Sequence, residues 1–216
     1  VGTYIGRNQA NGEYGDYSPD GHATSLTAVK KTLAELGAAA ASDNVDIVTL
    51  TDLSSELRLI VEASEAGLQL RDLNVISSPS QEIREIYDLM PTSTVEDWES
   101  IAERLSNVPQ AISGYIETLK EGIRQGITPA RRQVSEVFTQ IQKNSTNDGF
   151  FWNFAQSASV ETGALPEALV KNLANGAQLA SQAYGNLSTF FADELMPVAS
   201  KNDAIGRELY ALHSRK

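Results

Sequence analysis

The segment from Pro91 to Gln142 repeats one pattern, in which a helix-start signal precedes apolar residues at helical spacing. Thr94 is placed to cap the first helix, and Asp97, three residues later, completes a capping box. Asn107 followed by Val108 and Pro109 predicts the start of a second helix. Proline in a first turn gives up only an amide that has no helical partner.

Gly126 is typical of a helix end, and Thr128 followed by Pro129 predicts the start of the third helix. Each expected helix has one apolar face. These faces comprise Val95, Trp98, Ile101 and Leu105, then Ile112, Ile116, Leu119 and Ile123, then Val134, Phe138 and Ile141. The segment is therefore expected to be part of a helical bundle.

Helical periodicity also dominates the rest of the chain. We expect a helix that starts at Ser18–Pro19 with Leu26, Val29, Leu33 and Leu36 on its inward face, and a second helix over about 45–70. The second is apolar on more than one side, which is typical of a helix packed between others. A short helix follows Ser78–Pro79 and ends at Pro91, and a long one covers about 166–196.

These patterns predict an all-α protein, a bundle of about seven helices without a sustained strand pattern. Residues 1–216 are expected to form a single helical domain with an irregular lead-in at 1–17 and a possible sub-boundary in the polar loop 143–149. Aromatic residues at 150–154 follow that loop. They could form a ligand wall or a partner surface, but a core anchor is favoured because aromatic side chains bury large areas.

Three stretches resemble one bacterial family, namely PTSTVEDWESIAERL, YIETLKEGIRQGITPARRQV and, near the start, GDYSPDG. They are similar to the bacterial domain-of-unknown-function family 885, and the resemblance extends from about Tyr4 to Tyr210. Proteins of that family are several hundred residues long and resemble zinc metallopeptidases. Their histidine-glutamate metal-binding motif lies in the later half of the chain.

The resemblance therefore implies that this chain is the amino-terminal portion of a peptidase-like protein, the front part of a larger helical protein. A helical pattern that includes Leu209 and Leu212 runs up to Lys216 without a stop signal, which also predicts truncation at the C-terminal end. Zinc is expected only in the missing C-terminal part, with no cofactor in this chain.

Composition narrows the class of partner. The net charge of −11 argues against a nucleic-acid binder, which needs clustered lysine and arginine. No cysteine is present, so disulfides and thiolate sites are excluded, and either a cytoplasmic or an exported location is compatible. The sequence contains no apolar run of about 18 residues, the length that would suggest a membrane span.

Few residues are candidates for catalysis or for metal binding. His22 and His213 are the only histidines and lie far apart, so a zinc site within this chain is not expected. Scattered serines do not define a catalytic triad, and neighbouring carboxylates such as Glu82 and Glu85 are typical of a solvated helix face. We expect no catalytic residue and no metal ligand in this chain.

Arg131 and Arg132 are weak candidates for substrate binding. They lie in the first turn of a helix, where the helix dipole disfavours cations, so a compensating anion is expected. An ion pair with an acidic side chain of the protein itself is the simpler source of this anion. The family pattern here resembles Thr-Pro-Pro-Arg, with Ala130 in place of the second proline. A guanidinium at Arg131 would suit a substrate carboxylate.

Two hypotheses for function follow. The first is a non-catalytic wall of the substrate channel of a zinc-dependent peptidase-like protein, with the remaining C-terminal part of the protein and a peptide substrate as partners. The second is a helical interaction or scaffold module with no enzymatic activity. Apolar surface left on helices such as 166–196 also predicts a homodimer or larger species.

Overall fold

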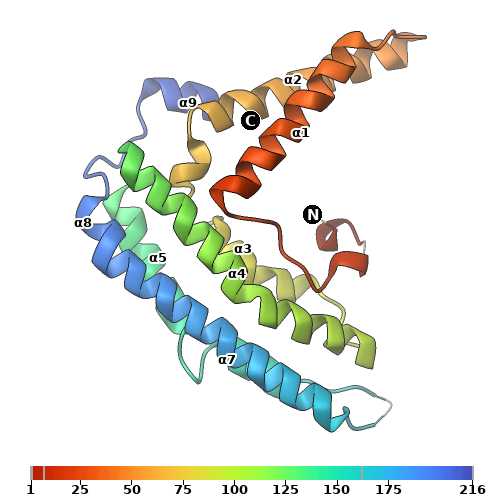
Figure 1. Cartoon of the computed structure of the whole chain (residues 1–216), viewed down its shortest axis with the longest axis vertical. Coiled ribbons are helices and arrows are strands. Elements are labelled where there is room, and N and C mark those ends of the chain that lie inside the picture. Colours follow the sequence, from red (N-terminus) through yellow and green to blue (C-terminus); the bar gives the residue numbers. More distant parts are fainter. Residues whose placement is uncertain (1, 7, 162, 216) are drawn as a thin grey trace.

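The protein is built from helices, as a computed structural model that describes residues 2–6, 8–161 and 163–215 shows (Figure 1). The all-α prediction is confirmed. The α-helices are α1 (Pro19–Ala38), α2 (Asn44–Glu65), α3 (Pro79–Glu85), α4 (Val95–Gln125), α5 (Arg131–Asn144), α6 (Phe150–Gln156), α7 (Glu167–Phe190), α8 (Met196–Val198) and α9 (Arg207–His213). Short 3-10 turns cover Thr3–Ile5, Asn8–Ala10, Leu68–Arg71 and Ile86–Leu89, and a π-helical turn covers Phe191–Leu195.

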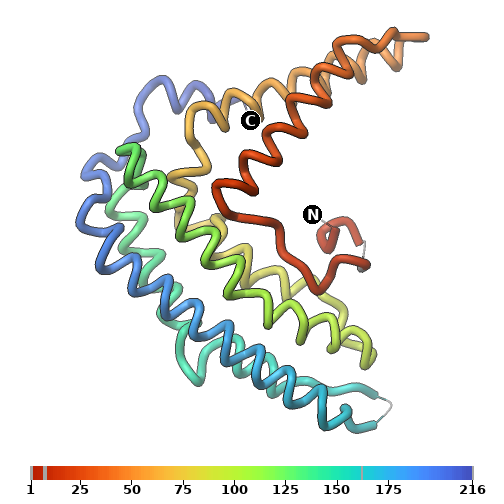
Figure 2. Tube along the Cα trace, in the orientation of Figure 1, coloured from red at the N-terminus to blue at the C-terminus, as the bar shows by residue number. Residues whose placement is uncertain are grey.

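The core lies between α4 and α7, which run side by side along most of their length (Figures 1 and 2). Each helix contributes an unbroken apolar stripe that is almost fully buried. The members on α4 are Ile101, Leu105, Val108, Ile112, Tyr115 and Leu119, and those on α7 are Leu173, Ala177, Ala180, Tyr184 and Leu187. The other bundle helices, α3, α5 and α6, pack around this pair.

The prediction of two helices on either side of Asn107 is wrong, because α4 continues through Pro109. Asn107 caps nothing and instead donates its side-chain amide to the Gly12 carbonyl over 2.9 Å. A proline inside a helix costs about 3 kcal/mol. Each fully buried apolar side chain stabilises by about 1.5–3 kcal/mol, so keeping the stripe continuous against α7 outweighs the proline.

The other ends of these helices agree more closely with the sequence. The capping box of Thr94 and Asp97 is confirmed, and Gly126 ends α4 in the left-handed conformation with φ 72°. The third helix was expected to start at Thr128–Pro129 but begins at Arg131. The difference arises because Ala130 forms an isolated parallel β-bridge with Ser200, through the backbone of Pro129 and Arg131, which holds this segment extended.

The aromatic residues after the 143–149 loop belong to the core. Phe151 is fully buried, with its ring centroid 5.1 Å from that of Tyr184 on α7. Phe154 lies 5.6 Å from Tyr87 and 5.4 Å from Trp98, measured between ring centroids. The cluster therefore anchors α6 against α4 and α7, as the core interpretation predicted.

Helices α1 and α2 form an antiparallel hairpin that extends away from the bundle (Figure 1). The expectation that α2 lies between other helices is wrong: it packs against α1, and near its C-terminal end against α9. Several of its apolar side chains are exposed as a result, namely Val45, Ile47, Val48, Leu53 and Ile60. Within the described parts of the chain, no helix is both long and apolar enough to cross a membrane.

The N-terminal segment is held on the bundle by Arg104 of α4, whose side chain is only 3% exposed. Its guanidinium donates to the backbone oxygens of Ala10 over 3.0 Å and Glu13 over 2.7 Å. It also lies 5.2 Å from the Tyr14 ring, within cation–π range. One buried cation thus fixes a segment that has little regular structure of its own.

The close approach of α4 to the Leu68–Arg71 turn depends on Gly122. A Cβ at this position would overlap the carbonyl oxygen of Leu70 and lie 2.6 Å from that of Ile127. We therefore expect Gly122→Ala to lower the free energy of unfolding by about 1–3 kcal/mol, the usual effect of overpacking. Chemical denaturation measures the change.

The matched control is Gly37→Ala in α1, where a Cβ would meet nothing within 4 Å. That variant should be as stable as the parent, or more stable by up to about 1 kcal/mol, since alanine favours the helix. Equal effects of the two substitutions would contradict the role given to Gly122.

Candidate functional site

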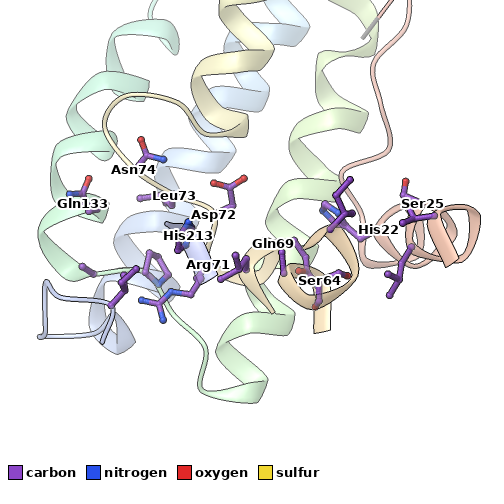
Figure 3. A pocket seen from close by; sticks show the side chains of 18 of the residues that line it. His22, Ser25, Ser64, Gln69, Arg71, Asp72, Leu73, Asn74, Gln133 and His213 are labelled. Carbon is purple, nitrogen blue, oxygen red and sulfur yellow. The ribbon is translucent and has the colours of Figure 1, made fainter. Parts of the chain in front are cut away.

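A cleft of about 570 Å³ lies where the base of the α1–α2 hairpin meets the bundle. Its lining comes from α1, α2, the Leu68–Arg71 turn and the loop after it, the start of α5, and the segment around α9. In Figure 3, Arg71, Asp72 and His213 gather near the centre, and His22 and Ser25 lie to one side of them. The site therefore combines segments from both ends of the sequence.

The floor of the cleft is the turn that carries Arg71, and α4 positions it. Gly67 starts this turn in the left-handed conformation with φ 70°, and Leu70 is buried beside Gly122. The Tyr115 hydroxyl donates to the Asp72 carbonyl over 2.7 Å. Burial raises the pKa of Tyr115 well above its usual value, so this hydroxyl stays a donor.

The side chain of Asn74 shapes the loop beyond the turn. Its oxygen accepts from the backbone amides of Ile76 and Ser77, both over 2.9 Å. Gln133 of α5 accepts from the Val75 amide over 3.1 Å, which ties this loop to α5. Asn74 and Gln133 both line the cleft, so its wall is held by side-chain hydrogen bonds.

The C-terminal segment closes another side. Ser200 bonds to the backbone of Pro129 and Arg131 over 3.0 and 2.7 Å, which leads the chain past the start of α5. Further on, Leu212 of α9 is buried with Leu59 and Ala63 of α2. Arg215 forms an ion pair with Glu62 of α2. These contacts bring Asp203, Ile205 and His213 to the cleft.

Helix α1 contributes His22 and Ser25, together with the apolar Leu26 and Val29. Its base is fixed on α4, where the Thr118 hydroxyl donates to the Tyr17 carbonyl over 2.7 Å. Burial lowers the pKa of His22, and the nearby carboxylate of Asp16 opposes that shift only in part. His22 is therefore a partly buried imidazole that favours the neutral form.

The cleft is lined by both histidines of the sequence, His22 and His213. In the described part of the chain, no side-chain hydrogen bond joins His22 or His213 to a serine or a carboxylate, so no activated nucleophile is assembled there. Nor do the described residues include a group of three or more histidine, cysteine or acidic side chains that could hold a metal ion. Zinc in the C-terminal part of the protein, which the family resemblance implies, stays a prediction.

Arg131 and Arg132 lie beside this cleft and do not line it. They border an open depression on the outer side of α5. Arg131 donates to the Pro197 carbonyl over 3.0 Å, and Arg132 forms an ion pair with Asp203 over 3.0 Å. Each cation thus has a partner within the protein, and a role in substrate binding stays a prediction.

Sequence reasoning missed most of the cleft. It weighed His22 and His213 only as zinc ligands, and it did not single out Arg71, Asp72 or Gln69. Gln69 lies between the last apolar residues of the helix expected at about 45–70, and Arg71 and Asp72 follow it, so no periodic signal distinguishes these three. Gly67 was the one available signal, since glycine at a helix end marks a turn.

A comparison with protein-family models matches the whole chain, residues 1–216, to a family described as bacterial protein of unknown function (DUF885). A search of the curated proteins finds no match.

The position of His22 predicts a pH dependence of stability. Because its pKa in the folded protein is lowered from 6.5, the unfolded chain binds the proton more tightly. The contribution of His22 to stability is present above pH 6.5 and is lost as the pH falls through the lower, folded pKa.

We expect His22→Gln to reduce the slope of the unfolding free energy against pH between about 7 and 5, measured by denaturation at each pH. An unchanged slope in this variant would show that the imidazole is not desolvated.

Proposed function

The chain belongs to the bacterial family of unknown function DUF885, and from this premise we propose that it is a non-catalytic, amino-terminal helical portion of a peptidase-like protein. In this role it forms part of the wall of a channel that binds a peptide substrate. Any zinc ion would be bound elsewhere in the protein.

The observation that carries the proposal is the cleft at the base of the hairpin. Its volume of about 570 Å³ falls in the range of ligand sites. One part of its lining is apolar and the other offers hydrogen-bonding side chains, with Leu26, Val29, Ile60 and Leu68 on the apolar side and Gln69, Asn74 and Gln133 on the polar side. A peptide presents the same combination of side chains and backbone amides.

The non-catalytic part of the proposal rests on the donor set of the cleft. Among the described residues, its histidines have no hydrogen-bonded partner that would make them general bases, and they belong to no group of side chains that could hold a metal ion. We expect the purified chain to bind zinc below stoichiometric amounts and to hydrolyse no peptide. Stoichiometric zinc, held by side chains of this chain, would contradict the proposal.

Peptide binding is tested by narrowing the cleft. Ser25 is an exposed residue of α1 that lines it, and Thr24 is an exposed neighbour that does not. We expect Ser25→Trp to weaken the binding of acetylated tripeptides, in acid and amide forms, by about tenfold or more because the indole fills part of the site. NMR titration measures the affinity.

Thr24→Trp is the matched control and should leave the affinity unchanged. Equal weakening in both variants would assign the effect to α1 as a whole. If neither form of the peptides shifts the resonances of the cleft in the parent protein, the channel-wall proposal is wrong.

A second candidate function, a helical interaction module, is favoured by the α1–α2 hairpin. The apolar side chains that it exposes include Val45, which is 72% exposed, and Leu53, which is 40% exposed. The remaining part of the same protein, or a second copy of the chain, is the proposed partner. The exposed apolar surface was expected on the helix at 166–196, but most apolar residues of α7 are buried.

We expect the chain to self-associate through this hairpin, and expect Val45→Ser with Leu53→Ser to shift it toward the monomer because less apolar surface is then exposed. Light scattering over a range of concentrations measures the mass. Val170→Ser, at a residue of α7 that is 50% exposed, is the control and should leave the mass unchanged. A parent chain that stays monomeric would overturn the idea.

A further inference from the structure

The cleft contains a cation that has no ion-pair partner among the residues that the structure describes. Arg71 lies on the floor, partly buried, and forms no ion pair with any other residue that the structure describes. Two other arginines near the cleft differ, since Arg132 pairs with Asp203 and Arg215 with Glu62. A partly desolvated guanidinium left unpaired is a natural site for an anionic group.

The charges around Arg71 limit which anion fits. Asp72 and Asp203 also line the cleft, and both are engaged by partners of their own. The lining carries one arginine and two aspartates, so a doubly charged phosphate would be repelled more strongly than a singly charged group. A single carboxylate has half that charge and matches the planar guanidinium.

The neighbouring surface suggests what the carboxylate is attached to. Apolar side chains of Ile60, Leu68 and Ile205 line the same cleft as Arg71. They offer a place for the side chain of a terminal residue. Gln69 and Gln133 also line the cleft, and amide side chains can both donate hydrogen bonds to a peptide backbone and accept them from it.

Building on the peptide-binding function proposed above, we infer that Arg71 binds the C-terminal carboxylate of a peptide, so that the cleft selects a free peptide end over an internal segment. The apolar wall holds the last side chain. Arg71 is thus a specificity-determining residue, because the last residue of the bound peptide lies beside it.

The experiment compares the peptides acetyl-Ala-Ala-X, where X is Leu, Phe or Lys, with their C-terminal amides. NMR titration of the parent chain follows the backbone amides of the cleft. We expect the acids to bind about tenfold or more tightly than the amides, because a hydrogen bond to a charged group is lost with the carboxylate.

Arg71→Gln should remove this preference while the amides bind as before. Arg58→Gln is the matched control, since Arg58 is an exposed arginine of α2 outside the cleft and its replacement changes the net charge equally. That variant should keep the preference. Thermal denaturation of both variants checks that they are folded.

The outcomes separate the two proposals. Equal binding of acids and amides at the cleft would overturn the role of Arg71 and leave the channel wall in place. Absence of binding by both forms would overturn the channel wall, and the inference with it. Inorganic phosphate that binds as tightly as the acids, and competes with them, would show a general anion site and also overturn the inference.

Discussion

The packing of α4 against α7 is the interaction on which the rest of the molecule depends. Both helices present continuous apolar stripes, and burying them stabilises the pair enough to keep α4 helical through Pro109. Because α4 then extends over 31 residues, it reaches from the aromatic cluster near Trp98 to the cleft near Gly122. One helix thus connects the core to the candidate site.

The cleft follows from how other segments attach to the C-terminal end of α4. Gly122 lets the turn that carries Arg71 approach closely, and Tyr115 fixes the backbone of Asp72. On the other side, Ser200 pairs with the backbone before α5 and directs the C-terminal segment toward α2. Side-chain and backbone hydrogen bonds thus both hold the wall of the cleft.

The hairpin has a different physical character from the bundle. Its two helices bury apolar residues mainly against each other, so much of the surface of α2 stays in contact with solvent. Exposed apolar surface of this kind is usually covered by a partner. The proposals for the cleft and for the hairpin are compatible, because Val45 and Leu53 do not line the cleft.

The sequence by itself determined the elements of this protein. Periodicity, the capping box at Thr94 and the glycine at Gly126 are local signals, since each acts through residues within a few positions, and they predicted the all-α class and both ends of α4, although not the end of α2 at Glu65. The 3.6-residue pattern of the long helix likewise predicted α7 and the first part of its continuation.

Tertiary structure alone decided where those signals were overridden and where the cleft lies. Local chemistry favoured a helix start at Pro109. Burial of the apolar stripe of α4 against α7, a contact between distant segments, stabilises the fold by more than the proline costs. The cleft joins His22 to His213 and both to Arg71, which no spacing in the chain relates. Such proximity arises only when the bundle has formed, because it depends on long-range packing and not on any local preference.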